Sequence, residues 1–500
     1  MTSSSELTPR TETSPDVSSD RFHRSMGVMS TFALGFTYLS PLVGIYSLFV
    51  FGLTLAGPSA MWWIPIVAVG QLLVALVFGE VVSQYPITGG IYPWARRLWG
   101  PKYAWLAGWI YLWALVVTAA SVAVYSSDFV ASLFGFHSTD LTTLVTGVVL
   151  LLLTFGINVS GTRMLGRVAR AGLFAELIGV VALGIYLLLF ERHNPFSVLF
   201  STLGAVGAEG TVLPGFLVAS LVGLWMFYGF EACGDVAEEV SNPGRAIPRA
   251  MIMTVVIGAI SAVIAYAGYV LAAPNLTDIV AGNVENPIAD ILRQSLGNIG
   301  MKVFLCVALL SFISGLLSLQ AALSRLLYSF GRDNMLPASS WLSRLSSEHA
   351  VPQNAMVVTC MAPLAICVIV YLMPGSLSRV TAFAVVGIYV CFQMVVLAAL
   401  RQRMKGWRPG GVWTLGRLGL PITCLALVWG VLGIVVLSWP GARDLMFLDR
   451  WIVLIGLFAV VALGATYMVL KRPYLRLNGP SGDAVAVADQ MRADRAQETA

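Results

Sequence analysis

The chain has 500 residues, of which 58% are hydrophobic and only 11% are charged. A soluble domain has about 25% charged residues, so this composition excludes a soluble globular protein and indicates a polytopic membrane protein. The net charge of +5 comes without any basic domain, so we expect no nucleic-acid partner.

Apolar runs of about 20 residues, the length that crosses a bilayer, predict an all-α membrane protein with twelve transmembrane helices. Their approximate limits are 28–54, 60–84, 103–134, 141–159, 166–190, 213–240, 250–273, 300–330, 355–373, 379–400, 418–439 and 449–470. The polar residues 1–25 and 476–500 are predicted to be disordered cytoplasmic tails.

Lys and Arg are distributed unevenly over the predicted loops. Sixteen of the 30 lie in the loops on the side of the N-terminus, six lie on the opposite side and eight lie in the two tails. Because cytoplasmic loops are enriched in Lys and Arg, we predict a multi-pass protein of the cytoplasmic (plasma) membrane with both termini in the cytoplasm.

The first predicted span contains Pro41, followed three residues later by Gly44. A proline inside a helix removes a backbone donor, and its ring clashes with the carbonyl of the residue four positions earlier, here Thr37. In lipid, such a break is tolerated where it lines a cavity or is buried in protein. A simple proline kink is the alternative, and this span alone leaves both interpretations open.

The sixth predicted span contains Gly229 near mid-depth and then Glu231. A lone carboxyl group at that depth costs several kcal/mol unless it is paired, hydrated or neutral. Spans one and six hold the same position in two successive sets of five spans. Because five is an odd number, the two sets insert into the membrane with opposite orientation. A pair of interrupted helices at matching places predicts the binding site of a transporter.

The ends of the two broken helices predict which ligand groups they bind. The second half of span one would begin near Gly44 with free N–H groups, and the first half of span six would end near Phe227 with free carbonyls. We therefore expect a carboxylate at residues 44–46 and an ammonium group at residues 225–228. The predicted substrate-binding residues are Ser40, Leu42, Val43, Gly44, Ile45, Trp225, Phe227, Tyr228 and Gly229.

Three motifs in a fixed order resemble those of a known family. They are FGEVVSQYPITGGIYPWARRLWGP after the second span, GFEACGDVAEEVSNPGRAIPRA at the sixth and SRLLYSFGRDNMLP at the end of the eighth. Over about residues 25–475 the chain is similar to the amino acid–polyamine–organocation (APC) permeases. It most resembles their amino acid/choline branch, on TYLSPLVGIYSLFVFGL in the first span.

This resemblance implies a LeuT-like five-plus-five inverted repeat with broken first and sixth helices. The repeats would cover residues 26–190 and 191–401, with two further helices over 402–475. It also implies uptake or exchange of an amino acid or amine, commonly driven by protons.

Some site residues follow from the resemblance alone. The glycine-rich loop of the family falls on Leu42, Val43 and Gly44, and only the last is a glycine here. Recognition of an α-carboxylate is therefore open, as are γ-amino acids, choline and polyamines. Trp225 falls on an aromatic gate position, and Glu231 falls on an acidic position linked to proton or substrate coupling.

Proton or ion coupling is predicted at Glu176, Glu231, Ser314 and Ser318. Glu176 of the fifth span matches a lysine that occupies the sodium position in some relatives, and it serves either coupling or a structural hydrogen bond. Glu231 either takes part in transport or is a structural acid bonded to unwound backbone. Ser311, Ser314 and Ser318 lie on one helix stripe and serve as hydroxyl ligands near Glu176 or as helix-packing residues.

Three acids lie at the cytoplasmic ends of predicted spans. Glu80 is expected to be structural, in an ion pair with a loop arginine. Glu238 and Glu239 are expected either to form an inner-gate network with Arg245 and Arg249 or to be solvated.

The predicted function is a secondary active transporter for an amino acid or amine, which works by alternating access and proton symport. An exchanger and a substrate sensor on a carrier fold are the alternatives. The spans contain no HExxH or GxSxG motif and no Cys/His cluster, so we expect no enzymatic activity, no metal and no cofactor. The expected partners are the small-molecule substrate, protons and the bilayer; the oligomeric state is open.

Overall fold

A computed structural model of the chain describes residues 22, 24–205, 212–284, 286–373, 375–439, 447–477 and 479–499. All named regular elements among these residues are helices. The predicted N-terminal tail over 1–25 lies almost entirely outside the described residues.

Ten helical stretches of the described residues are long and apolar enough to cross a bilayer. One of them, Val28–Gln84, has 57 residues and contains both of the first two predicted spans. The predicted sixth span is divided into short helices and is therefore not among the ten. The all-α membrane fold is confirmed, whereas the number of twelve spans stays a prediction.

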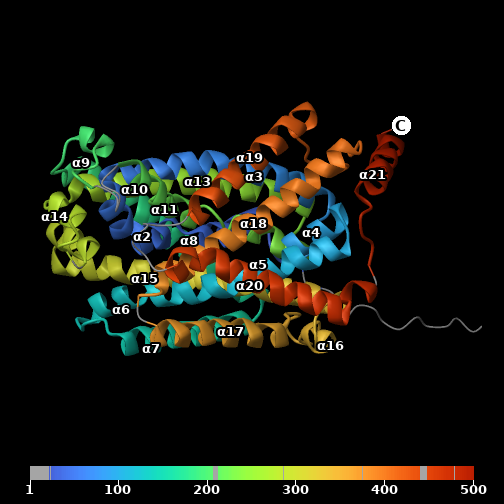
Figure 1. Ribbon diagram of the computed structural model, residues 1–500, viewed down its shortest axis with the longest axis horizontal. Helices are drawn as coiled ribbons and strands as arrows, with labels where there is room; N and C mark the ends of the chain where they lie inside the picture. Colours follow the sequence, from blue (N-terminus) through green and yellow to red (C-terminus); the bar gives the residue numbers. More distant parts are fainter. Residues whose placement is uncertain are drawn as a thin grey trace, which may run out of the picture.

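The long helices run alongside one another (Figure 1), as expected for apolar segments that must satisfy their backbone groups internally in lipid. The helices of the bundle, long and short, are in the first half of the chain α1 (Val28–Leu39), α2 (Pro41–Ala56), α3 (Trp63–Gln84), α5 (Pro101–Tyr125), α6 (Ser127–Phe134), α7 (Asp140–Val159), α8 (Thr162–Glu176) and α9 (Leu183–Phe190). The second half contains α10 (Val212–Val218), α11 (Ser220–Met226), α12 (Ala232–Asp235), α13 (Pro243–Ala272), α15 (Pro287–Arg332), α17 (Gln353–Leu372), α18 (Leu377–Met404), α19 (Gly419–Ser438) and α20 (Phe447–Lys471).

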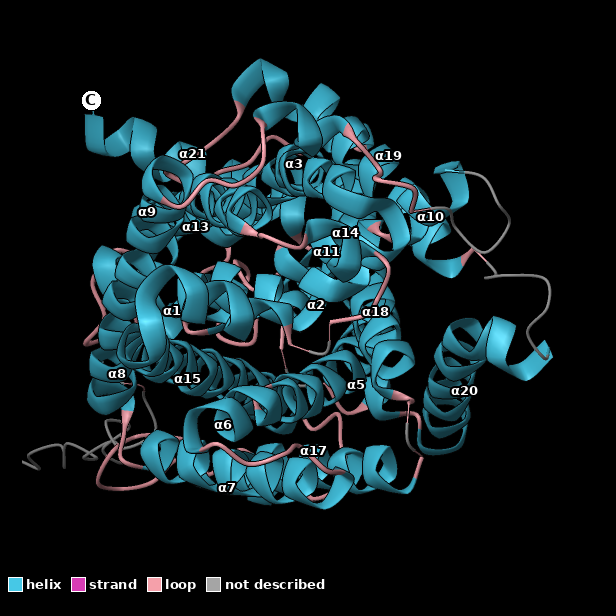
Figure 2. Cartoon of the chain, turned by 90° about the vertical axis from the view of Figure 1, so that its left-hand side faces the viewer, coloured by secondary structure: helices cyan, strands magenta, loops and turns pink. Residues whose placement is uncertain are grey.

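Helices α1 and α2 lie inside the bundle, as the view of Figure 2 shows. Helix α1 packs against α8, α13 and α15, and all of its residues from 31 to 39 are buried. Helices α19 and α20 instead expose many large apolar side chains. Such a surface would be a liability in water and suits contact with lipid, so the burial pattern separates an inner core from an outer, lipid-facing layer.

The prediction of a disordered tail over 476–500 differs from the structure, in which Ala484–Thr499 form helix α21. Ala484 and Ala488 are fully buried, and the Gln84 side-chain amide donates a hydrogen bond to the Ala484 carbonyl at 3.0 Å. Just before the helix, Asp483 pairs with Arg97 at 2.8 Å. The alanine-rich sequence favours a helix, and its small side chains allow close packing on the loops at the end of the bundle.

Glu80 forms the ion pair that the sequence analysis expects. Its partner is Arg403 near the end of α18, and the Leu415 amide donates to the other carboxylate oxygen at 2.6 Å. Both charged side chains are buried, so this pair joins α3 to α18 away from water.

We expect Arg403→Ala to destabilise the protein, because it leaves the buried carboxylate of Glu80 without its counter-charge. Loss of one partner of a buried pair costs about 3–5 kcal/mol, which should appear as a lower melting temperature of the detergent-solubilised protein. The control is Arg293→Ala, which removes a half-exposed pair with Asp290 and should cost less than about 1 kcal/mol. Equal melting temperatures for the two variants would contradict this assignment.

Candidate functional site

The first break lies at Ser40, which separates α1 from α2. Ser40 has a left-handed backbone conformation, with φ of 41°, and Pro41 is the first residue of α2. Proline suits that position because its missing N–H is not needed in the first turn of a helix. Leu42, Val43 and Gly44 therefore form the first turn of α2, whereas the sequence analysis expected a loop there.

The second break lies between α11 and α12. Helix α11 ends at Met226, and Gly229 has φ of +107°, a conformation that side chains disfavour. In the described part of the chain, no hydrogen-bond donor reaches the carbonyl oxygens of residues 225–228. These carbonyls are the free acceptors expected at the C-terminal end of a half-helix, which carries a partial negative charge.

The two breaks lie against each other. A Cβ atom built on Gly229 would come within 2.7 Å of the Leu39 amide nitrogen, so only glycine allows this approach of the two backbones. The two interrupted helices therefore contribute to one site, with the start of α2 on one side and the end of α11 on the other.

A small cavity lined by buried residues lies at the point where the breaks meet. Of the nine predicted substrate-binding residues, five line it: Ser40, Val43, Gly44, Trp225 and Tyr228. The sequence analysis missed the other six lining residues, Tyr38, Leu39, Thr118, Val122, Gly315 and Leu319. Leu42, Ile45, Phe227 and Gly229 belong to the breaks without lining the cavity. The space open to a water-sized molecule is about 20 Å³, enough for about one water, so the cavity has no room for a substrate in this structure.

Aromatic rings surround this cavity. The ring of Tyr228 packs edge-on against Trp225 and Tyr38, with centroids 5.6 and 6.1 Å apart. Tyr125 of α5 packs edge-on against Trp225 at 6.0 Å. Ring faces attract cations, so these side chains suit a positively charged ligand.

Glu231 is fully buried and bonded to the unwound backbone. Its carboxylate accepts hydrogen bonds from the Gly229 amide at 2.7 Å and from the Tyr111 hydroxyl of α5 at 3.1 Å. Asp235, four residues later, is also fully buried, and neither of its side-chain oxygens has a partner among the described residues. The sequence analysis missed Asp235, although its spacing of four from Glu231 was a usable signal.

Glu176, the last residue of α8, is fully buried and directed at the first break. Its Oε1 atom accepts hydrogen bonds from the Ser40 hydroxyl and from the Leu42 amide, the latter at 3.4 Å. This is the contact that the structural interpretation of Glu176 anticipates. Its Oε2 atom has no partner in the described part of the chain.

The contacts of the serine stripe of α15 fit the helix-packing alternative. Ser314 donates to the Ser311 carbonyl at 3.1 Å, and the Ser318 hydroxyl lies 2.9 Å from that of Thr37 in α1. No hydrogen bond joins Ser311, Ser314 or Ser318 to Glu176 in the structure. Ser318 therefore packs α15 against α1, and Ser314 lies against Gly172 of α8. Any coupling role of Ser314 and Ser318 stays a prediction.

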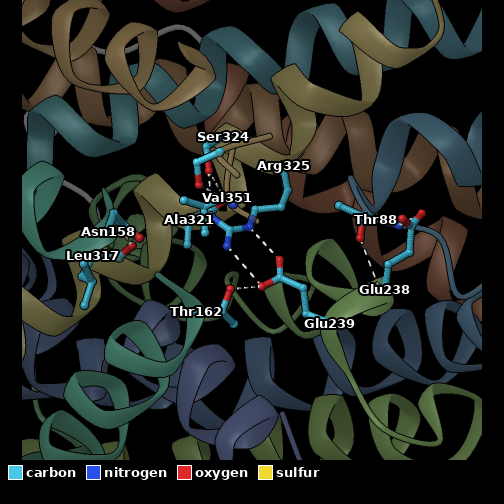
Figure 3. A network of polar contacts seen from close by, with 11 residues as sticks. Thr88, Asn158, Thr162, Glu238, Glu239, Leu317, Ala321, Ser324, Arg325 and Val351 are labelled. Atoms are coloured by element: carbon cyan, nitrogen blue, oxygen red, sulfur yellow. Dashed lines mark hydrogen bonds and ion pairs between the residues drawn. The ribbon is translucent and has the colours of Figure 1, made fainter. Parts of the chain in front are cut away.

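A polar network lies beyond α12 (Figure 3). Glu239 pairs with Arg325 of α15 at 2.9 Å, both side chains being buried, and accepts a hydrogen bond from the Thr162 hydroxyl of α8 at 2.6 Å. Glu238 pairs with Arg332 at 2.8 Å. The network exists as expected, but the prediction that Glu238 and Glu239 form it with Arg245 and Arg249 is wrong. The arginines that pair lie on α15, which the fold brings beside residues 237–239.

Gly229→Ala is expected to lower the melting temperature clearly, because Ala would be strained at this φ and would collide with the Leu39 amide. Strain of this kind costs about 1–3 kcal/mol. Gly156→Ala in α7 is the matched control, since its Cβ would meet nothing within 4 Å. Equal melting temperatures for the two variants would mean that the breaks do not touch.

Comparisons with known proteins agree with this architecture. A family model of amino acid permeases matches residues 26–463. The chain is 24% identical over 440 residues to an uncharacterized amino-acid permease of Schizosaccharomyces pombe, a match that covers 85% of this chain and 77% of the relative. It is 25% identical over 430 residues to the choline transporter of Saccharomyces cerevisiae, covering 83% and 76%. It is also 25% identical over 472 residues to an amino-acid permease BAT1 homolog of Oryza sativa, covering 84% and 86%.

The family match spans most of the chain, and the fold is that of a multi-pass membrane protein. The resemblance found in the sequence is thereby confirmed, and the protein is a transporter and not an enzyme. The chain belongs to the amino acid permease family of the APC superfamily.

Proposed function

We propose that this permease is a secondary active transporter that moves an amino acid or a related amine across the cytoplasmic membrane by proton symport. The observation that carries the proposal is the meeting of two broken helices at one buried cavity. Unwound backbone at membrane depth is costly, and transporters use discontinuous helices at this depth to bind their substrates.

Alternating access is part of the proposal. The cavity is too small for a substrate, so the broken helices must move before a ligand enters. The Glu239–Arg325 pair and the Thr162 contact tie three segments together, and we assign them to an inner gate that separates when the site opens to the cytoplasm.

One break in each set of five helices supports a LeuT-like inverted repeat over 26–190 and 191–401. The excess of Lys and Arg on one side supports cytoplasmic termini.

Glu231 is the group that we assign to proton coupling. It joins the unwound segment to Tyr111 of α5, so any movement of α11 and α12 relative to α5 changes its hydrogen bonds. Loss of those partners in an apolar setting favours the protonated carboxyl, and the neighbouring acid Asp235 acts in the same direction. Proton binding at Glu231 is thereby linked to the conformation of the break.

We expect Glu231→Gln to abolish accumulation driven by an inward proton gradient and to retain counterflow, because glutamine keeps the hydrogen-bonding shape without the titration. Proteoliposomes would be assayed with whichever amino acid, GABA, choline or polyamine raises the melting temperature most. Glu348→Gln, at an exposed side chain, is the control. An unchanged proton dependence of Glu231→Gln would contradict the assignment, and strict dependence on internal substrate in the wild type would identify an exchanger.

Glu176→Gln tests the second coupling candidate in the same assay. If Glu176 only caps α2, the variant keeps proton-driven accumulation, since a glutamine oxygen still accepts the Ser40 and Leu42 hydrogen bonds. If accumulation is lost while the melting-temperature response to ligand remains, the coupling proton belongs to Glu176 and not to Glu231.

A further inference from the structure

The start of α2 has no free amide to offer a ligand. Pro41 carries no N–H, the Leu42 amide donates to Glu176 at 3.4 Å and the Val43 amide donates to the Ser40 hydroxyl oxygen at 3.2 Å. The Gly44 amide donates to the Ser40 carbonyl at 2.9 Å. Every donor of this first turn is therefore already in use within the protein.

A substrate carboxylate would need those donors. The N-terminal end of a helix binds anions through its unpaired N–H groups and its partial positive charge. The side chain of Glu176 in α8 already places a carboxyl group of the protein at this position, where it accepts a hydrogen bond from the Ser40 hydroxyl. A carboxylate of the substrate would have to displace this side chain before it could reach the Leu42 amide.

The other groups around the cavity attract positive charge. No donor among the described residues reaches the carbonyls of residues 225–228, and the aromatic rings of Tyr38, Trp225 and Tyr228 line the cavity. The lining residues include no Lys, Arg or His and no Asp or Glu. Glu231 and Asp235 are buried acids behind this lining, on the side of the second break. The unpartnered Oε2 of Glu176, itself fully buried, is one more acceptor at the first break.

We propose that this site selects organic cations without a carboxylate, because Glu176 occupies the helix end that a substrate carboxylate would use. The inference rests on the proposed transport function and narrows its substrate class. It also replaces the expectation that a carboxylate binds at residues 44–46. Amines and quaternary ammonium compounds fit the site, whereas amino acids have a group for which it offers no partner.

Matched pairs of compounds test this proposal on the full-length wild type. Agmatine and arginine, putrescine and ornithine, and choline and glycine betaine each share a cationic group, and the second member of each pair adds a carboxylate. In detergent, we expect the carboxylate-free member of the best-binding pair to raise the melting temperature at an about tenfold lower concentration, a difference of about 1.4 kcal/mol. Equal or tighter binding of the carboxylated member overturns the proposal, as does the absence of a shift with all six compounds.

A variant then tests the role of Glu176 itself. Glu176→Ala frees the Leu42 amide and removes the carboxyl group that occupies the helix end, so we expect the preference within the best pair to fall to about threefold or less. Glu348→Ala removes an exposed acid and should keep the wild-type preference. A preference that persists unchanged in Glu176→Ala overturns the assignment to this residue, and the wild-type comparison decides the substrate class even where the variant does not fold.

The two proposals fail in different ways. Binding of the cation without counterflow in proteoliposomes refutes transport but supports the ligand class. Counterflow of the carboxylated member at equal or higher rate supports transport and refutes the ligand class.

Discussion

The site depends on one constraint, which is that backbone groups freed by a helix break inside a bilayer must find partners within the protein. Both breaks meet it with a buried glutamate. Glu231 accepts from the Gly229 amide in the second break, and Glu176 accepts from the Leu42 amide in the first. Each acid accepts a hydrogen bond from a backbone amide that the break leaves without a helical partner, so the buried carboxyl group and the unwound backbone satisfy each other.

This pairing gives the two ends of the site different chemistry. The first break is saturated, because Ser40 and Glu176 take up the amides of α2. The second break satisfies its amide at Gly229 but leaves the carbonyls of residues 225–228 free. A ligand that enters the cavity therefore meets acceptors and aromatic rings, and the charge it needs to match them is positive.

The sequence was sufficient for features that depend on local chemistry. Proline at 41 and glycine at 229 are informative because each restricts or frees the backbone wherever it stands, and both breaks were located to within a few residues. Glu80 was correctly predicted to form an ion pair with an arginine, although Arg403 lies in the last turn of α18 and not in a loop.

The features that the sequence did not reveal depend on tertiary contacts. Arg325 lies 86 residues after Glu239, so proximity along the chain favoured the wrong arginines. The contact between Glu176 and Leu42 joins helices 134 residues apart. Helix α21 forms where polar composition predicted disorder, because its small alanines pack on the rest of the protein. Tyr38 of α1 and Thr118 of α5 line the cavity because these two helices pack around it, which the sequence pattern does not show.

The most direct measurement is a cryo-electron microscopy structure of the protein with agmatine bound. The account predicts the guanidinium or ammonium group of the ligand at the carbonyls of residues 225–228, between Trp225 and Tyr228, with the Glu176 carboxylate still accepting the Leu42 amide. A ligand bound away from the two breaks, or a Glu176 side chain turned away from α2 so that its amides are open to the ligand, would contradict it.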